Sequence, residues 1–169
     1  VTMIYNMVDR IYIGHTSDGT TAMAALGITL PIITLITAIT NLFGMGGAPL
    51  CAISLGQKNR DRAEKIMANS FICLVDSSVI ITIGVLIFQE PILYLFGADS
   101  LTIEPAKEYT TIYILGTIFV QLTVGMNAYI NTQGFTKIGM KTVLLGAVLN
   151  IILDPVFIYL FDMGIRGAA

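Results

Sequence analysis

Charged residues are scarce in this sequence and absent from long stretches of it. Only 12% of the residues are charged, whereas soluble domains carry about 25%. Hydrophobic residues make up 55%, and the mean hydropathy is +0.81. No Asp, Glu, Lys or Arg occurs in residues 19–57 or 109–136. Both runs exceed the roughly 20 residues that cross a bilayer as a helix, so the sequence excludes a soluble domain and predicts a multi-pass membrane protein.

Signatures of disulfides, metal centres and nucleotide binding are also missing. Cys51 and Cys73 both fall in apolar segments, which indicates packing residues rather than a disulfide framework. His15 is the only histidine, so no second histidine can share a metal with it. No Gly-x-x-x-x-Gly-Lys loop occurs, which disfavours nucleotide-driven transport. The net charge of −2, without a basic patch, disfavours a nucleic-acid partner.

Hydropathy and helix breakers predict five helical segments. We expect helices because backbone groups in lipid must bond to one another within a segment, and the alternating pattern of a membrane barrel is absent. The second segment is too long for one straight crossing. Its Gly44–Pro49 cluster predicts a kink, needed either for packing alone or for a broken helix around a binding site. The predicted segments are residues 1–14, 21–55, 66–88, 109–134 and 142–161.

The connections between these segments differ in charge. Six of the nine basic residues lie in the connections 56–65 and 136–141. The connection 89–108 instead holds four acidic residues and one basic residue, Lys107. By the positive-inside rule, the two basic connections are cytoplasmic, and the acidic connection and the tail from residue 162 lie outside.

Three carboxylates lie inside predicted spans: Asp9, Asp76 and Asp154. Each would cost about 2.5–3.5 kcal/mol if ionised at the membrane centre, so an intramembrane acid indicates a functional site by default. The helices that carry Asp9 and Asp154 both run outward. At 1.5 Å per residue, both acids lie roughly 8–11 Å below the outer boundary. They could share one polar pocket, or they could only hold helices together through hydrogen bonds.

Asn150 lies one helical turn before Asp154, on the same face. Its amide oxygen and the carboxylate are hard oxygen ligands suited to a small cation such as Na⁺, or its NH₂ could donate to the carboxylate. Tyr5 and Asn6 lie on the face of Asp9 in the same way. Pro155 lacks an N–H and would free the carbonyl of Ile151.

Four further residues are candidates for supporting or substrate-lining roles. In the third segment, Ser77 and Ser78 could satisfy the carboxylate of Asp76. In the fourth segment, polar side chains form a partial stripe for which helix packing is an equally good interpretation. These four candidates are Asp76, Gln121, Asn127 and Asn131.

The segment MIYNMVDRIYIG (residues 3–14) resembles the first-helix signature of multidrug and toxic compound extrusion (MATE) transporters. LNIILDPVFIYLF (149–161), followed by MGIRGAA, resembles their fifth helix and the entry to the sixth, and GQKNRDRAEKIM (56–67) resembles the connection between helices two and three. The resemblance covers essentially the whole chain. It implies an all-α helical bundle with about five of the six helices of the N-terminal lobe. The chain begins without Met and stops at DMGIRGAA, where another element could start, so we expect a fragment. The resemblance implies that the sixth helix and the C-terminal lobe are the missing parts.

The resemblance implies a secondary transporter of the plasma membrane, without a cofactor, that exports cationic or amphipathic molecules in exchange for H⁺ or Na⁺. It places Asp9, Asn150 and Asp154 on the cation site of the N-terminal lobe, to which the family adds a sixth-helix hydroxyl. A lipid-linked saccharide flippase is an alternative, but such flippases carry more Arg and Lys along the cavity. An intramembrane aspartyl protease is a weaker one, because its Gly-x-Gly-Asp arrangement is absent. We therefore expect a transporter and not an enzyme.

Overall fold

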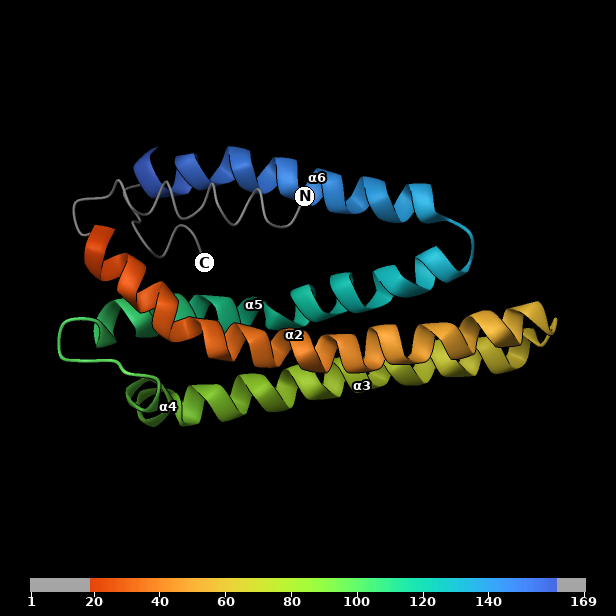
Figure 1. Cartoon of the computed structure of the whole chain (residues 1–169), viewed down its shortest axis with the longest axis horizontal. Helices are drawn as coiled ribbons and strands as arrows, with labels where there is room; N and C mark the ends of the chain where they lie inside the picture. The colour runs from red at the N-terminus through yellow and green to blue at the C-terminus, as the bar shows by residue number, and fades with distance from the viewer. Residues whose placement is uncertain (1–18, 161–169) are drawn as a thin grey trace. The chain divides into compact units, whose positions relative to one another are not determined.

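The computed structural model describes residues 19–160, and this part of the chain contains helices and no strand (Figure 1). Four of the described helices are long and apolar enough to cross a membrane, which confirms the predicted all-α membrane protein. The predicted first segment, residues 1–14, lies outside the described residues. The elements are α2 (Gly19–Gly56), α3 (Arg60–Ile87), α4 (Gln89–Leu95), α5 (Ile103–Thr132), α6 (Thr136–Pro155) and the π-helical segment η1 (Val156–Leu160).

Three of the long helices begin earlier than hydropathy predicts. They start at Arg60, Ile103 and Thr136, whereas the predicted starts were residues 66, 109 and 142. Hydropathy marks only the part of a helix that crosses lipid, and a helix continues into water wherever its first N–H groups find acceptors. At the start of α3, the side-chain oxygen of Asn59 accepts from the Arg62 N–H at 3.1 Å. This is the contact of a helix-capping residue.

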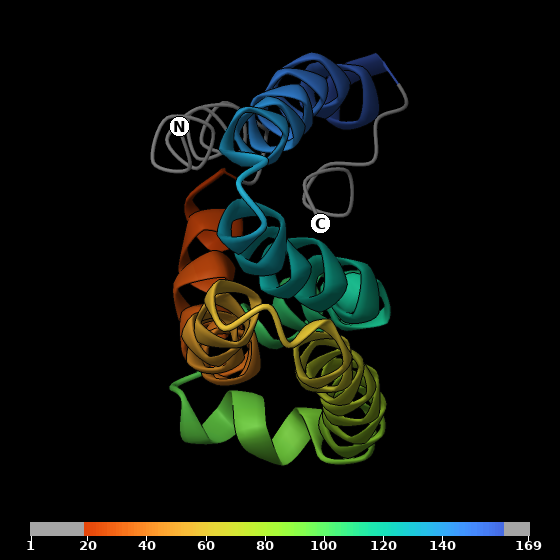
Figure 2. The same cartoon turned by 90° about the vertical axis from the view of Figure 1, so that its right-hand side faces the viewer.

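The described residues form two compact units. One contains residues 19–32, 85–115 and 142–160, and the other contains residues 33–84 and 116–141. The second unit brings together parts of α2, α3 and α5, with α2 and α3 side by side in both views (Figures 1 and 2). The first unit contains the short helix α4 and residues 142–155 of α6, whereas residues 136–141 of α6 belong to the second unit.

The glycine cluster of α2 lies where this helix meets α3 and α5. A Cβ on Gly44 would lie 2.8 Å from the Cα of Gly125, and a Cβ on Gly47 would overlap the Tyr129 hydroxyl. The helix continues without interruption from Gly19 to Gly56. Of the two interpretations of the cluster, the structure favours packing over a broken helix, because the absent side chains allow the backbones to approach closely.

The hydroxyl of Tyr129 joins α2, α3 and α5 in the second unit. Tyr129 lies on α5 and is fully buried. Its hydroxyl donates to the carbonyl of Phe43 on α2 at 3.0 Å and shares a second hydrogen bond with the Ser70 hydroxyl on α3. A carbonyl can only accept, so the tyrosine proton goes to Phe43 and Ser70 supplies the other proton. About two turns away, Ser77 of α3 donates to the Gln121 side-chain oxygen of α5 at 3.0 Å.

We expect Gly47→Ala to lower the free energy of unfolding by about 1–3 kcal/mol, because the new methyl group displaces Tyr129. Gly46→Ala is a matched control, since a Cβ there meets open space. It should leave stability unchanged or raise it by up to about 1 kcal/mol, because alanine is the better helix former. The thermal unfolding of the detergent-solubilised protein measures both changes. Equal effects of the two substitutions would show that no close approach is needed at residue 47.

We expect Tyr129→Phe and Ser70→Ala to be coupled in a double-mutant cycle. Hydrogen bonds between membrane helices contribute about 0.6 kcal/mol on average and up to about 1.7 kcal/mol, and the buried position of Tyr129 favours the upper part of that range. Unfolding of the two single variants and the double variant measures the coupling energy. Tyr94→Phe is the control, because Tyr94 is 54% exposed. Strict additivity of Tyr129→Phe and Ser70→Ala would contradict the assigned bond.

Candidate cation-coupling site

Helix α6 carries two of the three residues predicted to bind the coupling cation. Asn150 and Asp154 lie one turn apart on it. Asn150 is half-buried, and its side-chain oxygen is shielded from solvent. The side chain of Asp154 lies outside the described part of the structure, as do Tyr5, Asn6 and Asp9. The meeting of Asp9 with Asp154 therefore stays a prediction.

The helix changes its geometry one residue after Asp154. The α-helical part of α6 ends at Pro155, and the π-helical segment η1 follows from Val156 to Leu160. In an α-helix the ring of Pro155 would clash with the carbonyl of Ile151, and proline has no N–H to offer it. A π-helical turn contains more residues than an α-helical turn, and such turns are frequent at functional sites. Asp154 thus lies at an irregularity where backbone carbonyl groups can act as ligands.

The structure does not support the predicted partners of Asp76. The Ser77 hydroxyl donates to Gln121, and the Ser78 hydroxyl donates to the carbonyl of Val75 at 2.7 Å. The expectation that these serines satisfy Asp76 was therefore wrong: each lies on another side of α3 and bonds there. Asp76 itself is exposed and has no hydrogen bond or ion pair within the described residues.

The three amide candidates on α5 have packing contacts. Gln121 is fully buried and accepts from Ser77, so it joins α5 to α3. Asn127 donates to the carbonyl of Gly139 at 3.1 Å, and Asn131 donates to the side-chain oxygen of Asn127 at 3.1 Å. These two contacts secure the turn between α5 and α6, in which Gly134 has a φ of +87°. The arrangement favours the packing interpretation for all three amides.

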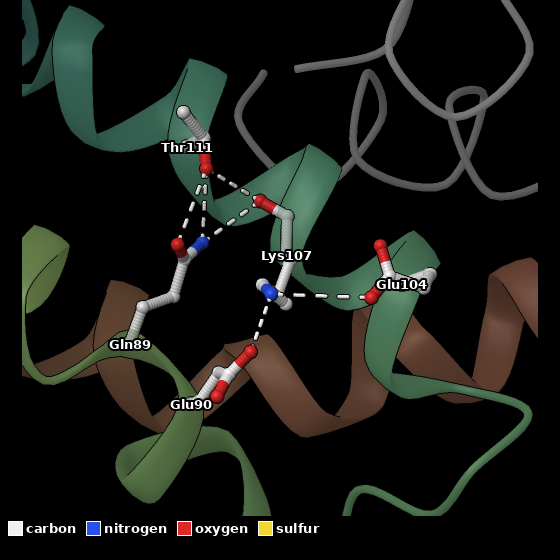
Figure 3. A network of polar contacts seen from close by, with 5 residues as sticks. All are labelled: Gln89, Glu90, Glu104, Lys107 and Thr111. Carbon is white, nitrogen blue, oxygen red and sulfur yellow. Dashed lines mark hydrogen bonds and ion pairs between the residues drawn. The ribbon is translucent and has the colours of Figure 1, made fainter.

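A network of polar contacts joins α4 to the start of α5 (Figure 3). The ammonium group of Lys107 lies 2.6 Å from the carboxylate of Glu90 and 3.9 Å from that of Glu104. The side-chain nitrogen of Gln89 donates to the carbonyl of Lys107 at 2.8 Å and to the hydroxyl of Thr111 at 3.0 Å. We call this network the α4–α5 clasp. The clasp holds α4, which belongs to the connection predicted to lie outside the membrane, against the membrane helix α5.

The clasp was not predicted from the sequence, although a signal for it exists. Lys107 is the only basic residue of the acidic connection 89–108, and a lone cation among carboxylates is expected to pair with one of them. The short helix α4 was missed as well. It has only seven residues, too few for a periodic pattern to stand out.

The turn before α5 is organised by one carboxylate. The Asp99 oxygen Oδ1 accepts from the backbone N–H groups of Leu101 at 3.0 Å and Thr102 at 2.8 Å, and from the Thr102 hydroxyl at 2.8 Å. Hydrogen bonds of this kind favour the charged form of a carboxyl group. The bonds from the Thr102 side chain and then its backbone lower the pKa of Asp99 below its ordinary value of 3.8.

Comparison with known proteins finds one family and close structural neighbours. The MatE family model matches residues 1–156. The chain is 28% identical to the multidrug export protein MepA of Staphylococcus aureus (strain MSSA476) and 30% identical to MepA of Staphylococcus saprophyticus. Both alignments cover the whole chain but only 37% of the relative. The chain therefore spans little more than a third of the length of these curated relatives.

Two solved structures have the same fold as this chain. A MATE protein crystallised in a bent conformation matches with a TM-score of 0.91 at 28% identity. An outward-facing multidrug resistance transporter of the MATE family matches with a TM-score of 0.90 at 27% identity. Each match covers 99% of this chain and 37% of the other.

We expect the Asp99 turn to depend on pH. Because the folded pKa of Asp99 is lowered, its stabilising effect is complete above the ordinary value of 3.8 and is lost as the pH falls through the folded pKa. Amide hydrogen exchange of Leu101 and Thr102, corrected for intrinsic rates, should show constant protection from pH 7 to 5 and a loss below 3.8. Asp99→Asn should remove this pH dependence. Protection that also falls with pH in Asp99→Asn would assign the change to another group.

Proposed function

Because the chain belongs to the MatE family, we propose that it is part of a secondary transporter that exports organic cations in exchange for H⁺ or Na⁺. Family members are transporters, so the chain is not an enzyme, and its helices cross the plasma membrane several times. The observation that carries the proposal is the Asn150–Asp154–Pro155 stretch, where polar ligands coincide with a π-helical turn inside a membrane span. The names of the relatives support export as the activity of the full-length protein, which would include a second lobe.

The position of the site along α6 fits uptake of a cation from outside. Asp154 lies 18 residues after Thr136, about 27 Å along the helix axis. The hydrocarbon core is about 30 Å thick, and the start of α6 lies in the connection predicted to be cytoplasmic. Asp154 is therefore closer to the outer side, the side from which a coupling ion enters an exporter.

The proposed mechanism uses the cost of a buried charge. Asp9 and Asp154 bind H⁺ or Na⁺ from outside, and neutralisation removes the electrostatic cost of keeping carboxylates in a dry site. The first helix then repacks, which weakens binding of the substrate cation and biases the transporter toward one of its two openings. Binding of the ion thereby opposes binding of the substrate through the conformation of the first helix.

The two coupling ions make different demands on the neighbours of Asp154. Na⁺ needs several oxygen ligands, which the amide oxygen of Asn150 and the carbonyl groups around Pro155 would supply. A proton needs only the carboxylate, and the Asn150 NH₂ would then act as a hydrogen-bond donor to it. By their chemistry, Asn150 and Asp154 suit either ion.

We expect Asp154→Asn in the full-length protein to abolish coupled efflux. Replacing the carboxylate removes a free-energy difference of about 2.5 kcal/mol or more between the ion-bound and ion-free states. This difference corresponds to a more than tenfold change in the equilibrium constant between the two openings of the transporter. Efflux of a fluorescent organic cation from cells, with the Na⁺ and proton gradients varied separately, measures the effect and identifies the ion. Membrane expression must be equal for the native and variant proteins.

Asp76→Asn is the matched control, because it makes the same replacement at another acid of the predicted spans, whose side chain is exposed and has no ion pair or hydrogen bond within the described residues. Efflux by Asp76→Asn should remain at the native level. Normal efflux by Asp154→Asn would show that Asp154 is structural. A native protein that moves no cation under either gradient would instead favour the flippase.

A further inference from the structure

A cavity of about 390 Å³ opens among the ends of α2, α3 and α5. Its apolar lining includes the buried Cys51 of α2 and the side chains of Leu55 and Met67. Its exposed lining includes Arg60 and Glu64, both on the first turns of α3. The cavity thus combines an apolar floor with a charged rim, and all of its residues belong to one compact unit.

The two charges on the rim do not pair with one another. Arg60 and Glu64 are one turn apart, a spacing of about 6 Å at which opposite charges on a helix often form an ion pair. Within the described residues, neither side chain has an ion pair or a hydrogen bond. Both instead line the cavity. The rim therefore offers one cationic donor and one anionic acceptor side by side.

A cation at the first residue of a helix is unfavourable, because the helix dipole places partial positive charge there. Arg60 is that residue of α3. An anionic group bound between the guanidinium and the helix terminus would offset the repulsion. Guanidinium groups bind phosphate with paired hydrogen bonds, which gives the chemistry of the expected anion.

The charge pattern places this end of α3 at the cytoplasmic surface of the membrane. Basic pockets between helices at that level bind lipid headgroups. Here the pocket also holds a carboxylate, which an anionic headgroup would avoid and a headgroup with an ammonium would use. A floor lined by Cys51, Leu55 and Met67 suits the glycerol and first acyl carbons of a lipid.

We propose that this cavity binds an ethanolamine phospholipid of the cytoplasmic leaflet. The phosphate lies at Arg60, the primary ammonium donates hydrogen bonds to Glu64, and the acyl chains enter over the apolar floor. A choline headgroup cannot donate those bonds, and a glycerol headgroup has no cation for Glu64. The inference does not depend on the proposed export activity.

The test uses the full-length protein, delipidated in a neutral detergent. Native mass spectrometry and thermal unfolding are recorded with phosphatidylethanolamine, phosphatidylcholine and phosphatidylglycerol of the same acyl chains. We expect phosphatidylethanolamine to bind more tightly and to raise the unfolding temperature more than the other two. Arg60→Gln and Glu64→Gln should each weaken its binding about fivefold, the effect of losing one charged contact at the membrane surface.

Matched controls lie in the same stretch of α3. Arg62→Gln and Asp61→Asn remove the same charges from residues that do not line the cavity, and both should bind phosphatidylethanolamine as the native protein does. Four results would overturn the proposal. These are equal binding of ethanolamine and choline lipids, tighter binding of phosphatidylglycerol, unchanged binding by Glu64→Gln, and equal stabilisation by water-soluble glycerophosphoethanolamine.

Discussion

The hydrogen bonds of the Tyr129 hydroxyl impose the constraint on which the second unit depends. In hydrocarbon no water is present to satisfy a hydroxyl, so Tyr129 must find its partners on neighbouring helices. It finds them on α2 and α3 only because those helices come close enough. Gly44 and Gly47 make that approach possible by leaving no side chain in the way. The hydrogen bonds of Tyr129 therefore depend on the close approach of the helices that Gly44 and Gly47 allow.

Helix α6 differs from the helices around Tyr129. After Pro155 its backbone is π-helical rather than α-helical, close to Asn150 and Asp154, the residues that we propose to bind the coupling ion. The chain thus combines a unit whose helices approach closely at glycines with a helix that departs from α-helical geometry after Pro155.

Local sequence patterns predicted what depends on local chemistry. The uncharged runs located the membrane helices, and the i, i+4 spacing identified Asn150 and Asp154 as neighbours on α6. Features that depend on tertiary contacts were not predictable in this way. The glycine cluster suggested a kink, because the approach of Gly125 is invisible in the sequence of α2. Ser77 and Ser78 lie beside Asp76 in the chain, yet their partners lie elsewhere.

The sequence distance between the partners of Tyr129 has a consequence for synthesis of the protein. Ser70 and Tyr129 are separated by 59 residues. At about 5–20 residues per second, a ribosome needs roughly 3–12 s to add them. During that interval α2 and α3 are present in the nascent chain without the residue that joins them. The insertion machinery must therefore tolerate or shield this helix pair, with its bare glycine surface, until α5 arrives.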